Sequence, residues 1–490
     1  MMNCTPPARR SRRSQPLAYA SLLASALASA THSHAAAPGV PALGGSAAGY
    51  VEYAVDSLPQ HFTGPGISAF DNTPIDNAIT DAGAELGRVL FYDPRLSHND
   101  GTSCASCHTQ ATGFTDSEQF SEGFEGGLTG RHSMGLSNAR WYESGRFFWD
   151  ERAATLEDQV LGPIQDAVEM GSDLTQLVSE LNDTEYYPVL FERAFGDSNV
   201  TSDRMAKAMA QFVRSMASYQ SPFDRAVAAG SVASPNFAAV DDIENPTEVT
   251  AGHALFQQEC AGCHRTVAQA ANETHNIGLP RIDADGDGEL DSDDGAGDQQ
   301  FKVPSLRNIA MRGRFMHDGR FQTLAEVVEF YSSGVTNNGD RLGVGLRVGG
   351  FGFSETEKAA LVAFLESLTD EEFLMSELFS NPLVALDGDY DGSGVVDDDD
   401  RLAWAAQFGL GEEDVSGPLM ADGNGDGVVD AADYSIWRDN LGTRWDDAVA
   451  ALAQAVPEPS TWLLAMLALA TPRRRARREP LALYSPNSSV

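Results

Sequence analysis

Two copies of the pattern Cys-x-x-Cys-His constrain this chain of 490 residues more than any other feature. Two thiols at this spacing form thioethers with the two vinyl groups of one haem, and the histidine beside them is placed to ligate the iron. The sequence therefore predicts two covalently bound haem c groups, one at each copy. The residues concerned are Cys104, Cys107 and His108 in the first copy and Cys260, Cys263 and His264 in the second.

The remaining cysteine usage supports this interpretation. The chain has five cysteines, and the fifth, Cys4, lies in a leader that export would remove. The other four all belong to the two patterns, so none is left for a disulfide framework. A zinc site needs its thiols gathered in one place, whereas a stretch of domain length separates the two patterns. Each pattern is therefore expected in a lobe of its own.

The composition limits the class of protein. Acidic residues outnumber basic ones by 71 to 33, and the formal net charge of -38 removes the electrostatic basis for binding nucleic acid. Such acidity suits divalent cations or basic protein partners. The length fits roughly three domains. Apolar residues recur at helical spacing over residues 204–218 and 354–368, while strand patterns are sparse, so the expected fold class is mainly α.

Both ends of the chain carry processing signals. Residues 1–37 combine four arginines, an apolar run and three consecutive alanines, the order of a secretory signal peptide. Residues 456–478 place a Pro-Glu-Pro motif before an apolar stretch and an arginine cluster, which resembles a PEP-CTERM sorting signal. That stretch is well short of the roughly 20 residues of a spanning helix, and a plain amphiphilic tail is the alternative. We expect an exported protein of the periplasm or cell envelope, attached to the surface through this C-terminal signal.

A series of short motifs in a fixed order surrounds the two haem attachment patterns. The motifs are Leu86-Gly87-Arg88-Val89-Leu90-Phe91-Tyr92-Asp93, Phe148-Trp149-Asp150-Glu151-Arg152-Ala153-Ala154-Thr155-Leu156, Gly162-Pro163-Ile164, Val168-Glu169-Met170, Phe301-Lys302-Val303-Pro304-Ser305-Leu306-Arg307-Asn308 and His317-Asp318-Gly319-Arg320. Over about residues 75–372 the series resembles the bacterial di-haem cytochrome c peroxidases and the MauG-type enzymes. The resemblance implies two cytochrome c-like haem lobes, hydrogen peroxide as substrate, and a small c-type cytochrome or copper protein as electron donor.

The resemblance also implies roles for four residues near the first haem. Glu169 corresponds to the distal carboxylate, which moves a proton between the two peroxide oxygens. Gln159 and Pro163 line the same pocket, and Trp149 occupies the position of the tryptophan between the haems. Without the motifs, a solvated glutamate and ordinary core packing of the tryptophan would be the alternatives.

The iron ligands distinguish members of this family. Peroxidases that need reductive activation close the first iron with a histidine; the corresponding position here is Phe124, which cannot bind iron, and His132 falls on a different motif position. The first haem is therefore expected to be five-coordinate. For the second haem, the register places Tyr331 where peroxidases have methionine and MauG-type members have tyrosine. Met316 is the rival ligand, and His317 is expected to be a structural or electron-relay residue.

Calcium is the second predicted cofactor. The resemblance implies one ion between the lobes, held partly by backbone oxygens around Arg312 and Arg314. Three segments carry oxygen ligands at EF-hand spacing, one in an insertion at residues 283–298 and two after Pro382. The predicted ligands are Asp283, Asp285, Asp287, Asp291 and Asp294 in the insertion, Asp389, Asp391, Ser393, Asp397 and Asp400 in the second loop, and Asp422, Asn424, Asp426, Asp430 and Asp433 in the third.

The two later loops, each followed by an apolar helical pattern, resemble a dockerin, a module that binds a cohesin domain. A calcium-stabilised tail without a partner is the alternative, since metal binding supplies folding free energy to a segment with little core. The expected organisation is a signal peptide at 1–37, a lead segment at 38–74, a peroxide-reactive first haem lobe at 75–230, an electron-transfer second haem lobe at 245–372, a dockerin-like α domain at 383–447 and the sorting signal at 456–478.

Three functions agree with these features. The leading hypothesis is an exported di-haem peroxidase that reduces hydrogen peroxide with electrons passed from the second haem to the first. A MauG-type oxidase, which uses peroxide to oxidise a protein or organic substrate, is the close alternative. The third is a non-enzymatic electron carrier displayed by the calcium module, and Glu169 argues against it.

Overall fold

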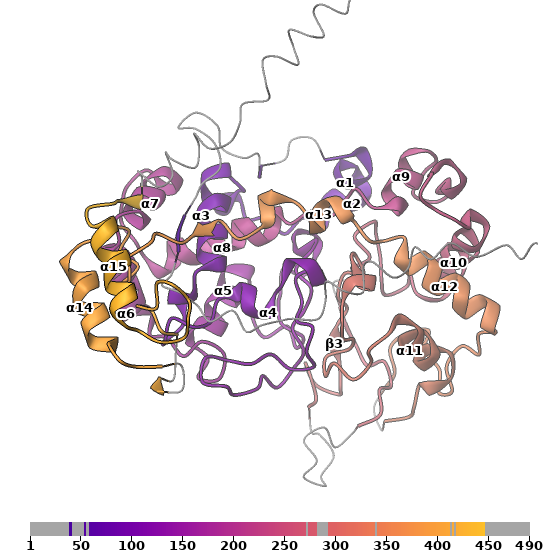
Figure 1. Ribbon diagram of the computed structural model, residues 1–490. Helices are drawn as coiled ribbons and strands as arrows, with labels where there is room; N and C mark the ends of the chain where they lie inside the picture. Colours follow the sequence, from indigo (N-terminus) through magenta and orange to yellow (C-terminus); the bar gives the residue numbers. More distant parts are fainter. Residues whose placement is uncertain are drawn as a thin grey trace, which may run out of the picture.

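Helices dominate the fold, as the sequence predicts (Figure 1). The computed structural model describes residues 39–41, 53–54, 58–270, 273–281, 293–338, 341–411, 414–415 and 418–445. The predicted signal peptide, the sorting signal and most of the insertion loop lie outside these residues. Within the described ranges, no helix combines the length and the apolar character that crossing a membrane requires.

The helices form two lobes and a small C-terminal module (Figure 1). Those of the first lobe are α3 (Asp81–Tyr92), α4 (Cys104–Cys107), α5 (Leu156–Gln165), α6 (Leu174–Asp183), α7 (Tyr187–Phe195) and α8 (Ser202–Ser215). Those of the second lobe are α9 (Pro222–Ala228), α10 (Pro246–Glu259), α11 (Leu324–Glu329) and α12 (Glu355–Glu366). The module contains α14 (Asp398–Gln407) and α15 (Ala431–Asn440), and the short helices α1 (Gln60–Thr63), α2 (Pro65–Ser68) and α13 (Glu371–Leu374) lie in connecting segments.

Strands occur only as two-residue pairs in the described ranges. Strand β1 (Val40–Pro41) pairs antiparallel with β4 (Leu383–Val384), and β2 (Thr274–His275) pairs antiparallel with β3 (Phe301–Lys302). The first pair joins segments from opposite ends of the chain, and the second pair closes one edge of the second lobe. Neither pair is large enough to form a layer of its own.

Each lobe is framed by a pair of helices that cross at a glycine. Helix α3 crosses α8 at Gly87, where a Cβ atom would overlap the carbonyl oxygen of Ala208. Helix α10 crosses α12 at Gly252 in the same way, against the carbonyl oxygen of Ala360. Because glycine alone allows this backbone approach, the two lobes repeat one packing solution around their haem attachment patterns.

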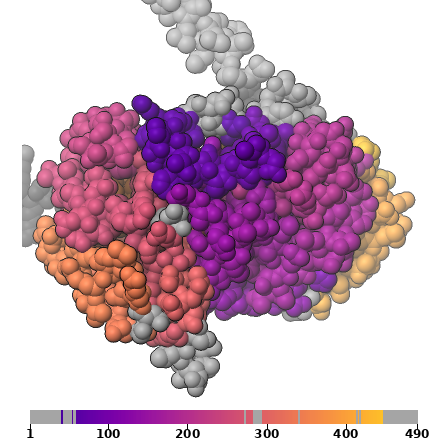
Figure 2. Space-filling model, turned by 180° about the vertical axis from the view of Figure 1, so that it is seen from behind, coloured from indigo at the N-terminus to yellow at the C-terminus, as the bar shows by residue number. Residues whose placement is uncertain are grey.

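Two segments tie the parts together. The segment around α1 and α2 spans both lobes (Figure 2), with Phe62 packed on Trp141 at 4.8 Å between ring centroids. Residues 370–384 run back across the first lobe after α12 (Figure 1), where Phe373 and Phe379 join its aromatic cluster. The second lobe's apolar core already includes Phe223, which lies inside the range predicted for the first lobe.

A buried ion pair joins three segments at the boundary between the lobes. Arg307 is fully buried and donates to both oxygens of Asp224 at 2.5 and 2.8 Å. His61 Nε2 donates to the same carboxylate at 2.9 Å. Burial alone would raise the pKa of Asp224, but the charge and hydrogen bonds of Arg307 outweigh burial and hold that pKa well below its usual range. The carboxylate therefore stabilises the fold as an anion.

We expect Asp224→Asn to lower the free energy of unfolding by about 3–5 kcal/mol, because it leaves the buried Arg307 charge without its counterion. Since the folded-state pKa of Asp224 is depressed, this stabilisation is complete above the ordinary carboxyl pKa and is lost as the pH falls towards the folded-state value. Denaturant unfolding at several pH values measures both effects. The control is Asp242→Asn, whose exposed pair with Arg225 should be worth about 0–1 kcal/mol; equal losses in the two variants would contradict the assignment.

Candidate active site

A cavity in the first lobe brings together the residues that the motifs single out. Helix α5 is capped at its N-terminus by Thr155, whose hydroxyl accepts from the Asp158 amide at 3.0 Å. Gln159 and Pro163 are four residues apart on this helix, hence on one face, and both line the cavity. Glu169 lines the same cavity, as does His108 of the first haem attachment pattern.

Local hydrogen bonds hold Glu169 at the cavity. The side chain of Asp166 accepts from the Glu169 amide at 3.2 Å, and the Glu169 carbonyl accepts from the Phe124 amide at 3.1 Å. The loop before Phe124 approaches so closely that a Cβ atom on Gly123 would overlap the Val168 carbonyl oxygen. Burial raises the pKa of Glu169; the charge of Asp166 adds to this, and Arg152 opposes it. The carboxyl group is thus half-buried and more basic than an exposed glutamate.

The two pattern histidines share one orientation. His108 Nδ1 lies 2.9 Å from the Phe114 carbonyl oxygen, and His264 Nδ1 lies 3.2 Å from that of Gln269. A carbonyl can only accept, so each Nδ1 carries the proton and each Nε2 is left free to ligate a metal. Burial also lowers the pKa of both imidazoles, that of His264 to about 4, which keeps them in the neutral, ligating form.

Phe124 stands at the position where a closing histidine would lie, and it offers no imidazole to the cavity. The Phe124 ring packs on Gly171 and against the His98 ring and is not among the described residues that line the cavity, to which the loop contributes Leu128. Among the described lining residues the histidines are His108 and His132. Among the described residues that line this cavity, His132 is thus the one imidazole besides His108.

A shared wall separates this cavity from one in the second lobe. Residues 132–135, Trp149 and Lys302 line both cavities. Trp149 Nε1 donates to the His132 carbonyl oxygen at 2.7 Å, and the Trp149 carbonyl accepts from the Lys302 amide at 2.7 Å. These two hydrogen bonds, one at the indole nitrogen and one at the backbone carbonyl of Trp149, fix the indole between the cavities. The His317 ring meets the indole edge-on at 6.4 Å and stacks on Phe301 at 3.6 Å.

The second cavity is lined by Cys260, Cys263 and His264 and by both predicted sixth ligands, Tyr331 and Met316. Tyr331 lies where helix α11 widens into a π-helical turn, Phe330–Gly334, a distortion that is frequent at functional sites. Burial, followed by the nearby thiols, raises the pKa of Tyr331 well above its usual value. Met316 lies in a turn with a left-handed φ of 73°, which is uncommon for a residue with a side chain.

The donor sets and cavities fit two haem c groups. The second cavity presents both thiols of its pattern beside His264 and has mainly apolar walls, whereas the first presents Cys107 beside His108 and has walls of mixed polarity. Sequence reasoning linked Arg312 only to a calcium ion. In the described part of the chain this buried guanidinium has no carboxylate partner, and its Nε lacks any hydrogen-bond partner. A haem propionate would meet that unpaired charge.

Most of the calcium ligands predicted in the insertion lie outside the described residues, whereas those predicted in the module lie within them. Asp283, Asp285, Asp287 and Asp291 lie outside the described residues. Of the adjoining acidic pair, Asp294 binds Arg281 at 2.7 Å, and Asp293 binds Arg131 of the first lobe through two bonds of 2.7 Å. The Asp293 carboxylate thereby anchors the end of the insertion beside the first cavity.

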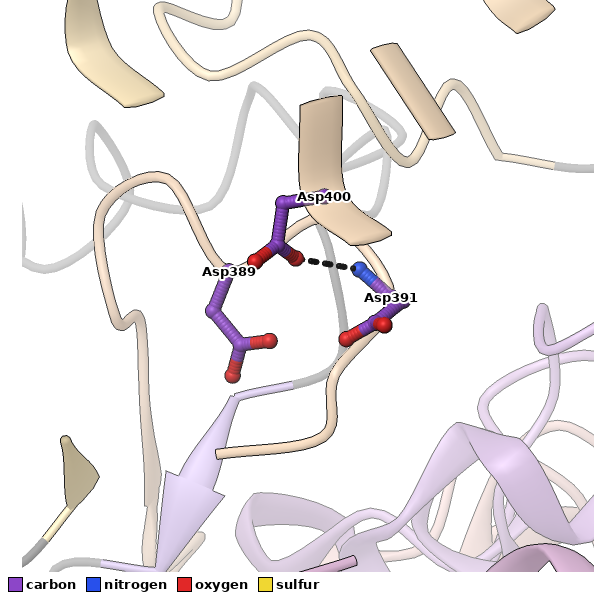
Figure 3. Close-up of side chains that lie close together, drawn as sticks. All are labelled: Asp389, Asp391 and Asp400. Carbon is purple, nitrogen blue, oxygen red and sulfur yellow. Dashed lines mark hydrogen bonds between the residues drawn. The ribbon is translucent and has the colours of Figure 1, made fainter. Parts of the chain in front are cut away.

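The first loop of the module gathers three carboxylates (Figure 3). The side-chain oxygens of Asp389, Asp391 and Asp400 lie within 4.8 Å of one another, and the three groups face a common space. Asp389 is 1% exposed, and its Oδ1 has no hydrogen-bond partner. Burial and then the charges of Asp400 and Asp391 raise the pKa of Asp389 to about 8. Ser393 donates to the Val395 carbonyl oxygen, and Asp397 caps α14.

The second loop of the module is satisfied internally. Both oxygens of Asp422 accept from backbone amides of the loop, at Gly425, Asp426 and Gly427, and Asp433 accepts from the Asn424 amide. Asp430 caps α15 as Asp397 caps α14. The two loops therefore share a sequence pattern but differ in their electrostatic state.

Comparisons with known proteins agree with this geometry. Residues 81–231 match the di-haem cytochrome c peroxidase family, and residues 249–369 match the cytochrome c family. The methylamine utilization protein MauG of Methylophilus methylotrophus is 33% identical over 299 residues, which are 60% of this chain and 84% of that protein. The cytochrome c551 peroxidase of Nitrosomonas europaea is 31% identical over 340 residues, 64% of this chain and 90% of the relative.

Solved structures show the same fold. A MauG-like protein associated with microbial copper homeostasis superposes with a TM-score of 0.56 at 30% identity, covering 67% of this chain and 99% of that one. The diheme peroxidase BthA of Burkholderia thailandensis has a TM-score of 0.51 at 24% identity, covering 62% of this chain and 90% of its own, which indicates a shared fold alone. The C-terminal module lies beyond both family matches. With its two haem attachment patterns on two matching lobes, this chain belongs to the di-haem cytochrome c peroxidase/MauG family of oxidoreductases.

Proposed function

We propose that this protein is an exported peroxidase that reduces hydrogen peroxide to water with electrons from a small c-type cytochrome or copper protein. One observation carries the proposal: Gln159, Pro163 and Glu169 line the cavity that His108 also lines. A non-enzymatic electron carrier needs no carboxylate at that place. Export rests on the signal-peptide pattern of residues 1–37, and surface attachment through residues 456–478 stays a prediction.

Haem, when bound at the two attachment patterns, supplies iron for peroxide and electrons for the cleavage of its O–O bond. Glu169 takes the proton from the near oxygen of peroxide and returns it to the departing oxygen, so that water leaves. Its half-buried position and raised pKa suit both directions of this transfer, because the carboxyl group is a better base than an exposed one. Gln159 and Pro163, fixed on α5, orient peroxide and limit the space around it.

Electron delivery uses the wall between the cavities. The hydrogen bonds at Nε1 and at the carbonyl hold Trp149 in place, and its ring contacts His317, which lines the second cavity. We assign Trp149 as the bridge for electrons that pass from the second haem to the first. The first haem is proposed to be five-coordinate at rest because phenylalanine, at position 124, has no atom that can bind iron.

A MauG-type oxidase is the second candidate. Tyr331, placed in the π-helical turn at the second cavity, and the 33% identity to a MauG protein favour it. An anionic tyrosine ligand stabilises higher oxidation states of iron, which suits an enzyme that withdraws electrons from a protein or organic substrate. The two candidates share Glu169 and differ in the source of the electrons that enter the protein: a small redox protein for the peroxidase, and the substrate that is oxidised for the MauG-type oxidase.

We further propose that the module binds calcium, first at Asp389, Asp391 and Asp400. An unpartnered oxygen of a buried carboxylate among two further carboxylates is satisfied by a divalent cation with oxygen preference. Calcium at the insertion loop and between the lobes, and a cohesin-type partner of the module, stay predictions.

We expect Glu169→Gln to lower the rate of peroxide reduction roughly 10²–10⁴-fold, the usual contribution of a positioned proton-transfer group. In the unchanged protein, activity should fall as the pH drops through the raised pKa of Glu169, because only the ionised carboxylate accepts a proton. Steady-state rates across pH measure both effects. Glu125→Gln, at an exposed position of the neighbouring loop, is the control; unchanged turnover in Glu169→Gln would contradict the enzymatic role.

Electron paramagnetic resonance of the isolated ferric protein tests the ligands. We expect one high-spin haem, open at the first cavity, and one low-spin haem. Tyr331→Phe should alter the low-spin signal, since it removes the proposed ligand, whereas Met316→Leu should leave it in place. Two low-spin haems would argue that His132 or another group closes the first iron, and a low-spin signal sensitive only to Met316 would reverse the ligand assignment.

A further inference from the structure

The first calcium loop of the module packs against the first haem lobe. Arg95 Nη1 donates to the Gly392 carbonyl oxygen at 2.5 Å, and the Glu185 amide donates to the Ser393 carbonyl oxygen at 3.0 Å. The side chain of Arg444 forms an ion pair with Glu185. Figure 1 shows the module beside α6 and α7, and Figure 2 shows it at the edge of the molecule.

The contact is part of the interior of the lobe. Arg95 is buried and pairs with Asp93, which is fully buried, through bonds of 2.8 Å. Asp93 also accepts from the Tyr187 hydroxyl at 2.5 Å, and the Arg95 guanidinium lies 5.2 Å from the centre of the Tyr186 ring. The Gly392 carbonyl oxygen thus accepts a hydrogen bond from a buried N–H group of Arg95. Loss of this hydrogen bond would leave a buried charged donor without a partner.

Apolar packing strengthens the same contact. Gly394, with a left-handed φ of 92°, leaves its backbone close to the Tyr186 ring, and Trp445 meets that ring at 6.1 Å between centroids. Tyr390 and Trp437 of the module belong to one apolar cluster with residues of the first lobe. The module and the lobe are therefore continuous rather than joined by a flexible tether.

The segment that follows Arg95 supports the proton-transfer residue. The His98 amide donates to the Met170 carbonyl oxygen at 2.8 Å. The Asn99 side chain donates to the Phe124 carbonyl oxygen at 2.7 Å, and the Phe124 amide in turn holds the Glu169 carbonyl. Residues 93–99 therefore connect the calcium loop to the backbone on which Glu169 is placed.

We propose that a divalent cation, calcium, bound by Asp389, Asp391 and Asp400 braces the first haem lobe through Arg95 and thereby holds the Glu169 segment in its working position. The partner of this loop is the chain's own catalytic lobe, and the cation acts as a regulator of that lobe. The inference rests on the proposed function for the role of Glu169.

The physical basis is charge repulsion within the loop. Without a cation, three neighbouring carboxylates repel one another, and the loop relieves this by opening, which withdraws the Gly392 carbonyl from Arg95. A cation neutralises the repulsion and satisfies Asp389 Oδ1. The second loop, whose carboxylates are satisfied by its own amides, forms its hydrogen bonds within the module in the described part of the chain.

Hydrogen exchange of the full-length holoprotein, with calcium chloride or with a chelator, tests the brace. Calcium at about 100 times its dissociation constant should slow exchange of the amides of residues 93–104 by up to roughly 100-fold, if their exchange requires release of the cation. Asp389→Asn should abolish most of this response. Asp422→Asn, the same change at the matching position of the second loop, should retain it.

Asp391→Ala decides the matter if Asp389→Asn does not fold, because Asp391 is exposed and alanine, unlike the asparagine that the second loop carries at the equivalent position, Asn424, offers no ligand oxygen. This variant should also lose the response. A wild-type protein without a calcium response, an equal response in the first-loop variants, or its loss in Asp422→Asn would overturn the brace. Hydrogen exchange is measured without peroxide and does not depend on catalysis. An unchanged turnover of Glu169→Gln would therefore refute the proposed function, whereas the exchange experiment would still show whether calcium stabilises the first lobe.

Discussion

Each haem lobe encloses a cavity that its own side chains leave open, and the rest of the structure is arranged around the need to fill it. The helix pairs that cross at Gly87 and Gly252 frame the cavities without occupying them. His108 and His264 are turned inward by carbonyl groups that hold their Nδ1 protons. A covalently attached group supplies the apolar contacts that the side chains of the lobes leave unmade, and burying its apolar surface on folding contributes to stability.

The same requirement explains how the lobes are joined. Two cavities that share a wall must keep that wall rigid, since a movement of Trp149 would alter both. The Asp224–Arg307 pair lies at the lobe boundary and is reached by His61 from the segment that spans both lobes. A buried pair of this kind adds little net stability over apolar packing but tolerates few alternative arrangements, which suits a boundary that must hold one geometry.

Local patterns in the sequence predict the parts of the site that depend on short separations. The spacing of Gln159 and Pro163 on one helix places both at the cavity, and the two attachment patterns predict the positions of both haems. Contacts between residues that are far apart in the sequence could not be predicted in this way. Arg95 meets Gly392 across nearly 300 residues, and no periodicity or motif records such a meeting. The unpaired charge of Arg312 is likewise invisible in the sequence, because burial and the absence of a counterion are tertiary properties.

The two loops of the module that carry the EF-hand pattern show why a pattern alone does not define a site. Their ligand spacing is almost the same, and each ends in an aspartate-capped helix. In the second loop, backbone amides satisfy Asp422, so the carboxylate is stable as it stands. In the first loop, which packs on the first haem lobe, Asp389 is buried and one of its oxygens is unpartnered beside two more carboxylates. The two loops thus differ in their surroundings: the first is held against the first haem lobe through Gly392 and Ser393, and no ligand spacing in the sequence records that contact.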